Sequence, residues 1–128
     1  MIYESLFLFA VFWTVVLEVP VVLILWKLVF RKNDPSWLRV VIVAALASAL
    51  TLPYFWFILP PYVDASLYIW WGEGLVFVAE ALIYWVFLCE KLSWPEGLLR
   101  SLVLSGVANA VSYVFGIYLL PDIVEFLF

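Results

Sequence analysis

Four long apolar segments constrain this chain more than any other feature of its sequence. They cover about residues 6–30, 37–59, 67–88 and 98–120, and an α-helix needs roughly 20 apolar residues to cross the hydrocarbon of a bilayer. Apolar residues make up 69% of the 128 residues and charged residues only 12%. Such a composition cannot cover a water-exposed surface. The sequence therefore predicts an all-α membrane protein with a single membrane domain over residues 1–128.

The three breaks between these segments are short and rich in turn-forming residues. The first break runs from Arg31 to Ser36, the second contains Pro60 and Pro61, and the third covers residues 93–97. Connections of this length place consecutive helices side by side and antiparallel. We therefore expect a four-transmembrane-helix bundle made of two helical hairpins.

The basic residues are distributed on one side of this predicted bundle. All of them flank the first or the third break: Lys27, Arg31, Lys32, Arg39, Lys91 and Arg100. Lys and Arg are enriched in cytoplasmic connections. The distribution predicts a multi-pass protein of the plasma (cytoplasmic) membrane with both termini outside.

The two predicted hairpins share a local sequence pattern. Arg39 is followed by Ala-Ser-Ala-Leu-Thr at residues 47–51, and Arg100 by Ala-Asn-Ala-Val-Ser at residues 108–112, at the same spacing. This favours an internal parallel repeat with its axis along the membrane normal; the alternative is chance similarity between apolar helices. The repeat would pair Glu18 with Glu80, Ser48 with Asn109, and Thr51 with Ser112.

Polar side chains within the apolar segments are the candidate functional residues. A charged side chain at the centre of a bilayer costs roughly 2.5–3.5 kcal/mol on insertion scales, so such residues indicate function by default. Glu18, Glu80 and Asn109 fall near the middle of their segments, and Glu73 lies two helical turns before Glu80. We expect Glu18, Glu73, Glu80 and Asn109 to bind protons or ions.

Helical spacing adds a set of supporting polar residues. Thr14 lies one turn before Glu18, and Tyr84 one turn after Glu80, so each can donate a hydrogen bond to its neighbour. Small polar residues in the second and fourth segments allow close helix packing and hydrogen bonds between helices. The supporting residues are Thr14, Ser48, Thr51, Tyr84, Ser105 and Ser112.

Composition also excludes several classes of function. The chain has no histidine, and its one cysteine, Cys89, allows neither an internal disulfide nor a multi-cysteine metal cluster. A net charge of −4 does not favour nucleic acid as a partner. We expect no cofactor and no enzymatic activity, and the sequence leaves a metal site open.

Two functions compete for the intramembrane glutamates. The first is proton- or cation-coupled transport or ion binding. The second is structural: an accessory subunit of a membrane complex or a homo-oligomeric scaffold, in which protonated glutamates hold helices or partners together. Apart from the lipid bilayer, the expected partner is a second copy of the chain or another membrane subunit.

Four short spans with a glutamate in the first are similar to the architecture of small multidrug-resistance transporters. This resemblance covers size, span number and the position of Glu18, and it implies coupled transport by analogy only. Two further glutamates and a one-way charge bias depart from that family and argue against an antiparallel dimer.

The second hairpin resembles small uncharacterised prokaryotic four-helix membrane proteins. The resemblance rests on Gly-x-x-Phe-Val-x-Glu-Ala around Glu80 and on Ala-Asn-x-x-Ser-x-x-x-Gly from Ala108 to Gly116. It implies no particular activity.

Overall fold

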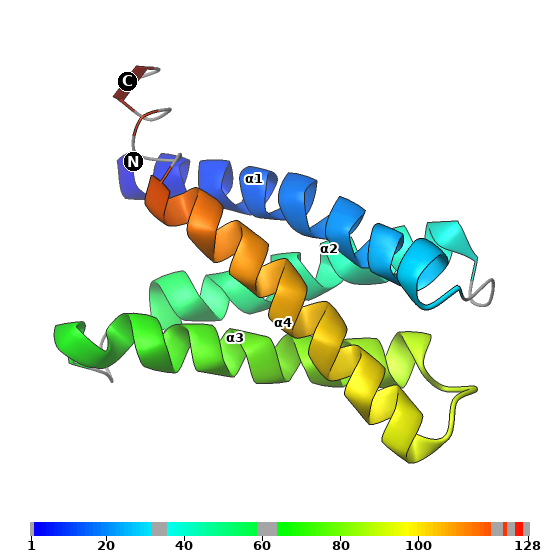
Figure 1. Cartoon of the computed structure of the whole chain (residues 1–128). Coiled ribbons are helices and arrows are strands. Elements are labelled where there is room, and N and C mark those ends of the chain that lie inside the picture. Colours follow the sequence, from blue (N-terminus) through cyan, green and yellow to red (C-terminus); the bar gives the residue numbers. More distant parts are fainter. Residues whose placement is uncertain (1, 32–35, 59–63, 119–121, 123–124, 127–128) are drawn as a thin grey trace.

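Within the residues that the structure describes, the chain is all-helical (Figure 1). The computed structural model describes residues 2–31, 36–58, 64–118, 122 and 125–126. Its helices are α1 (Ile2–Ile24), α2 (Trp37–Pro53), α3 (Ala65–Leu88) and α4 (Trp94–Tyr118). By length and composition, these four helices could each cross a membrane. Lys32, Pro60, Pro61 and the C-terminal ends of the second and fourth predicted segments lie outside the described residues.

Two of the helices are extended by short π-helical turns. Segment η1 (Leu25–Val29) continues α1, and η2 (Tyr54–Ile58) continues α2. Pro53 is the last residue of α2, and proline removes one backbone hydrogen bond from the preceding turn. The wider π turn follows directly after this loss, and it carries the helix on to Ile58.

The helix α4 begins four residues earlier than the fourth apolar segment predicts. Trp94, Pro95 and Gly97 belong to its first turn rather than to the connection. Proline fits the first turn of a helix because its missing N–H has no helical partner there. The Gly97 amide donates to the Ser93 carbonyl at 2.8 Å, which starts the helical ladder.

Gly97 also permits the close approach of α4 to the end of α3. A Cβ at this position would lie 3.2 Å from the Cβ of Cys89 and 3.2 Å from the Trp85 ring, too close for ordinary packing. The Cys89 thiol is buried, and burial raises its pKa to about 11. It therefore packs as a neutral thiol near pH 7.

The helices form a ring in chain order. α1 packs against α2 and α4, and α3 packs against the same two helices, so α1 and α3 lie diagonally across the bundle. Neighbouring helices run in opposite directions, and α4 crosses the bundle at a steep angle (Figure 1). We refer to α1–α2 as the first hairpin and to α3–α4 as the second.

The two ends of the bundle differ in charge. The start of α1 and the end of α4 lie at the same end of the bundle, which we call the terminal end (Figure 1). At the opposite end, which we call the basic end, the chain passes from α1 to α2 and from α3 to α4. At the basic end Arg39 pairs with Glu90 at 3.2 Å. The Arg100 guanidinium lies 4.6 Å from the centroid of the Phe30 ring. These contacts join the two hairpins.

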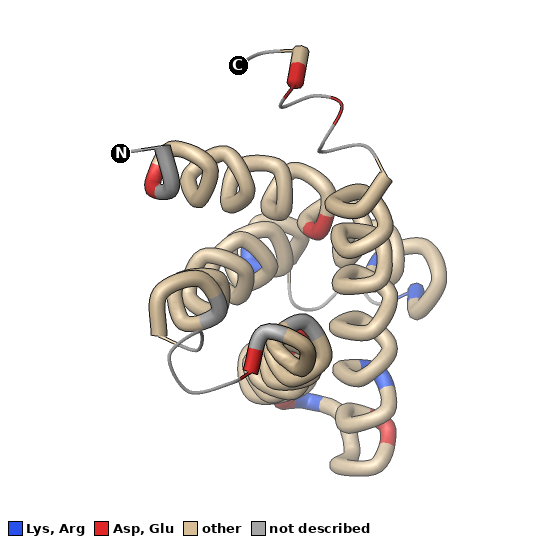
Figure 2. The backbone as a smooth tube through the Cα atoms, turned by 90° about the vertical axis from the view of Figure 1, so that its left-hand side faces the viewer, with Lys and Arg blue, Asp and Glu red and all other residues tan. Residues whose placement is uncertain are grey.

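Charged positions are rare along the helices themselves. Figure 2, which looks onto the terminal end, shows few red or blue positions on the four helices. The apolar core, with Trp26, Ala47, Leu88 and Ala108, is packed between the centre of the bundle and the basic end. The terminal half of the bundle is more open.

The buried positions of α2 recur in α4 at a constant offset. Val40 and Ser101 are both fully buried and lie 61 residues apart in the sequence. The same offset relates four further buried pairs: Val43 with Leu104, Ala44 with Ser105, Ala47 with Ala108, and Ser48 with Asn109. At an offset of 62 residues, buried Glu18, Val22 and Trp26 of the α1–η1 helix match buried Glu80, Tyr84 and Leu88 of α3.

Candidate functional site

Two buried carboxyl groups face each other at the centre of the bundle. Glu18 in α1 and Glu80 in α3 are each 1% exposed, and both line the same cavity. A carboxylate can only accept hydrogen bonds, so each of them needs donors from the surrounding helices.

Hydroxyl and amide groups from α2 and α4 surround this pair. Ser48 donates to Glu18 Oε2 at 2.5 Å, and Ser112 donates to Glu18 Oε1 at 2.8 Å. Thr51 donates to Glu80 Oε1 at 3.0 Å, and the Asn109 amide to Glu80 Oε2 at 3.1 Å. Each carboxylate oxygen thus accepts one hydrogen bond, as buried polar groups require.

The arrangement of these donors is the same for both carboxyl groups. Each receives one hydrogen bond from its own hairpin, from Ser48 for Glu18 and from Asn109 for Glu80. Each receives a second hydrogen bond from the opposite hairpin. The sequence predicts that Ser48 corresponds to Asn109 and Thr51 to Ser112. With this pairing, each hydrogen bond to Glu18 has a counterpart among the hydrogen bonds to Glu80.

The two donors from the opposite hairpin each have a second acceptor within reach. The Thr51 hydroxyl lies 2.8 Å from the Ala47 carbonyl oxygen, and the Ser112 hydroxyl lies 3.1 Å from that of Asn109. A hydroxyl has one proton to donate and two lone pairs to accept with. Each can therefore donate to an ionised glutamate, or donate to its own helix and accept from a protonated one.

The donor that Glu80 receives from its own hairpin is fixed in direction. The Asn109 amide nitrogen can only donate, and its 2.8 Å contact to the Ser105 carbonyl oxygen holds it in that orientation. Ser105 in turn donates to the Phe77 carbonyl oxygen at 2.7 Å, which ties α4 to α3. Glu80 is thus bonded by one donor-only amide and one hydroxyl, whereas both groups that bond Glu18 are hydroxyls, those of Ser48 and Ser112.

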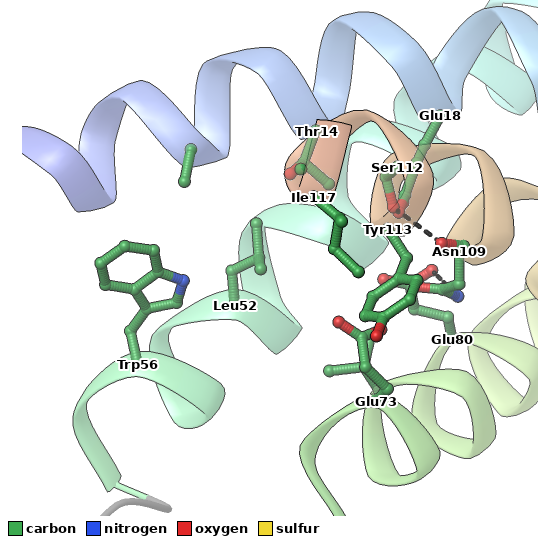
Figure 3. Close-up of a pocket in the computed structure, with 13 residues that line it drawn as sticks. Thr14, Glu18, Leu52, Trp56, Glu73, Glu80, Asn109, Ser112, Tyr113 and Ile117 are labelled. Atoms are coloured by element: carbon green, nitrogen blue, oxygen red, sulfur yellow. Dashed lines mark hydrogen bonds between the residues drawn. The ribbon is translucent and has the colours of Figure 1, made fainter. Parts of the chain in front are cut away.

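A cavity of about 260 Å³ adjoins the pair on the terminal side (Figure 3). All four helices contribute to its wall. Its polar lining residues are Thr14, Glu18, Glu73, Glu80, Asn109, Ser112 and Tyr113. Leu52, Trp56 and Ile117 supply much of the apolar wall. Both carboxyl groups of the pair thus border this cavity.

Glu73 stands apart from the other two glutamates. It is half-buried, lines the cavity, and makes no hydrogen bond or ion pair among the described residues. It also lines a second opening of about 380 Å³ between α3 and α4, together with Asn109 and Tyr113. The third carboxyl thus lies where the two spaces meet.

Two of the predicted supporting contacts are wrong. Tyr84 is fully buried, but its hydroxyl has no hydrogen-bond partner among the described residues, because Glu80 is bonded by Thr51 and Asn109 instead. Thr14 lines the cavity beside Glu18 without donating to it. Donors on neighbouring helices are closer to the glutamates than residues one turn away on the same helix.

The small and polar residues of α4 are not all packed closely against other helices. Ser101, Ser105 and Asn109 are buried. A Cβ added at Gly116 would meet nothing within 4 Å, and Gly116 lines the cavity.

Sequence reasoning missed the aromatic part of the cavity wall. Neither Trp56 nor Tyr113 is among the candidate or supporting residues predicted above, although Tyr113 directly follows Ser112. Among the described residues, no group of three His, Cys, Asp or Glu side chains could hold a metal ion. No protein-family model, curated protein or solved structure matches this chain.

Proposed function

We propose that the four helices span the plasma membrane as one multi-pass domain with both termini outside. Their length and composition support this placement. The basic residues that the structure describes at the ends of helices, such as Arg39 and Arg100, lie at the basic end. Because Lys and Arg favour the cytoplasmic side, that end would face the cytoplasm.

We further propose that the two hairpins are an internal parallel repeat. Constant offsets of 61 and 62 residues between equivalent buried positions support it. The exchange symmetry of the four hydrogen bonds to Glu18 and Glu80 is independent support. The carboxyl pair would then lie on the axis that relates the hairpins.

At this pair, we propose, the protein takes up and releases a proton, as in proton-coupled transport. The observation that carries this proposal is the reversible hydroxyl of Thr51 and of Ser112, each placed between a glutamate and a backbone carbonyl. Each hydroxyl keeps a hydrogen bond in either protonation state of its glutamate. An unsatisfied buried polar group costs about 1–3 kcal/mol, so this arrangement lowers the cost of changing state.

Proton uptake into liposomes tests the proposal. The purified protein is reconstituted with a pH-sensitive dye inside the vesicles, and an inward proton gradient is applied. Glu18→Gln and Glu80→Gln should each abolish protein-dependent acidification, because the side-chain amide of Gln does not titrate near neutral pH. Thr51→Val and Ser112→Ala should slow it. Unchanged acidification in both Gln variants would refute proton exchange at the pair.

A matched control separates chemistry from folding. Glu125 carries a carboxylate near the end of the chain and is exposed, so Glu125→Gln should acidify like the wild type. Each variant should also elute from size exclusion in mild detergent at the wild-type position. A variant that changes its elution volume reports on assembly rather than on proton transfer.

The second candidate function is that of an accessory subunit or a homo-oligomeric scaffold. The unbonded carboxyl of Glu73 beside a lateral opening favours it, because a basic or polar partner helix would satisfy that group. This function predicts that Glu73→Gln alters oligomeric state or co-purifying partners. Under it, Glu18→Gln and Glu80→Gln leave acidification unchanged.

A further inference from the structure

The opening between α3 and α4 has a different character from the central cavity. It has a volume of about 380 Å³ and lies on the side of the bundle rather than at its end. Its wall consists of Trp70, Glu73, Gly74 and Phe77 from α3, and Asn109, Ala110 and Tyr113 from α4. Glu73, Asn109 and Tyr113 also line the central cavity, so the two spaces meet at these three residues.

Glu73 is a feature of the second hairpin alone. At the offset of 62 residues that relates Glu18 to Glu80, the position equivalent to Glu73 is Val11. The hydrogen bonds of the carboxyl pair involve neither residue. The third carboxylate is therefore not needed to build the pair, and its position calls for a separate explanation.

Three hydrogen-bond acceptors gather at this junction. The Glu73 carboxyl and the Tyr113 hydroxyl make no hydrogen bond among the described residues, and both residues line the two spaces. Asn109 uses its amide nitrogen toward Glu80 and Ser105, which leaves its amide oxygen as an acceptor. A ligand that fits must donate several hydrogen bonds and carry positive charge.

Around these acceptors the wall is aromatic. Trp70 and Phe77 line the same opening, and no basic side chain lines it to neutralise Glu73. Aromatic faces attract cations and also pack against apolar chains. In a membrane such an opening would be accessible from the lipid, so an apolar tail could remain in the bilayer while the head group enters.

We propose that this opening binds an amphiphile with a protonated primary amine and an apolar tail. The ammonium donates to Glu73, to the Asn109 amide oxygen and to the Tyr113 hydroxyl, and the tail packs against Trp70 and Phe77. The N–H donors distinguish this ligand from a quaternary ammonium, which has charge but no proton to donate. The inference rests on the proposed membrane placement and not on proton exchange at Glu18 and Glu80.

Calorimetric titration of the full-length protein in an uncharged maltoside detergent tests the inference. The probes are dodecylamine, dodecyltrimethylammonium and dodecanol. Dodecylamine should bind saturably, the trimethylammonium more weakly, and dodecanol without saturation. Glu73→Gln should weaken dodecylamine binding about tenfold or more, because it removes the charge partner of a hydrogen-bonded cation. Equal affinity for dodecanol and dodecylamine would overturn the proposal in favour of a groove for lipid chains.

Two glycines provide variants that block each space separately. A Cβ at Gly74 or at Gly116 would meet nothing within 4 Å, so both helices should tolerate a larger side chain. Gly74→Leu fills the lateral opening and should abolish dodecylamine binding while acidification persists. Gly116→Leu narrows the central cavity and should slow acidification while dodecylamine still binds. Glu125→Gln, the charge control, should bind like the wild type.

These results separate the two proposals. Dodecylamine binding that survives both Glu73→Gln and Gly74→Leu refutes the amine site, whatever the acidification assay gives. Lost acidification in Glu80→Gln together with normal dodecylamine binding supports both proposals. If the wild-type protein binds dodecylamine but shows no acidification, proton exchange alone is refuted.

Discussion

The first and second hairpins provide equivalent groups to the centre of the bundle but differ at its side. Each contributes one glutamate, one donor to that glutamate and one hydroxyl that donates to the glutamate of the other hairpin. Only the second contributes Glu73, which lines the opening between α3 and α4. The glutamates and donors that both hairpins contribute are the groups that the proposed proton exchange requires. Glu73, which only the second hairpin contributes, marks where a second ligand would bind near the pair.

The difference extends to the donors themselves. Asn109 takes the place that Ser48 has in the first hairpin, and it lines both the cavity and the lateral opening. A longer amide reaches Glu80 while keeping a second contact to Ser105. The second hairpin thus has more hydrogen bonds around its glutamate, although the lateral opening lies between its two helices.

Overpacking the core should have the largest effect and should affect both hairpins alike. Ala47 and Ala108 lie 61 residues apart, would be equivalent in the proposed repeat, and are both fully buried. Ala47→Leu and Ala108→Leu should each lower the free energy of unfolding in detergent by about 3 kcal/mol, the upper part of the range for overpacked cores. A difference above about 1.5 kcal/mol between them would break the equivalence.

Removal of the donor that each glutamate receives from its own hairpin should come next in size. Ser48→Ala leaves one oxygen of Glu18 without its donor, and Asn109→Ala does the same to Glu80. We expect losses of about 1–2 kcal/mol in the same unfolding assay, because helix–helix hydrogen bonds in membranes reach about that value. The Asn109 variant should lose more, since it also breaks the contact to Ser105.

Removal of the reversible hydroxyls should cost less. Thr51→Val and Ser112→Ala each break one hydrogen bond between hairpins, and we expect about 0.6 kcal/mol for each, the average for such bonds. The two losses should be equal within experimental error. A loss confined to one variant would show that the two hydroxyls do not have equivalent roles.

Substitutions of Arg39 and Arg100, which the proposed repeat would pair, should differ in their effect on the free energy of unfolding. Arg39 pairs with Glu90 while both side chains are largely exposed. Arg100 is less exposed and bonds Glu96 at 2.8 Å while it covers the Phe30 ring. Arg39→Gln should cost about 0.2–0.5 kcal/mol. Arg100→Gln should cost about 0.5 kcal/mol more, from the lost cation–π contact. Equal costs would show that this contact contributes nothing.

The smallest effect on stability should come from Glu73. Because it has no hydrogen bond or ion pair among the described residues, Glu73→Gln should change the free energy of unfolding by less than about 0.5 kcal/mol. The same variant should weaken dodecylamine binding. A large loss of stability would mean that the carboxyl supports the fold rather than a ligand.

The sequence alone determined the four helices, because runs of about 20 apolar residues broken by prolines and charges leave a chain few alternatives. It also indicated Glu18, Glu80 and Asn109 as one central group, since their depth in each helix follows from residue numbers. The repeat spacing already paired Ser48 with Asn109 and Thr51 with Ser112.

Only the tertiary structure decided which donors reach the glutamates. Helical spacing favoured Thr14 and Tyr84, residues on the same helix as Glu18 and Glu80, but the bonds come from α2 and α4. Contacts between helices depend on crossing angles, and here α4 crosses the bundle steeply (Figure 1). Residues from several helices line the cavity and the lateral opening, an arrangement that no pattern along one helix encodes.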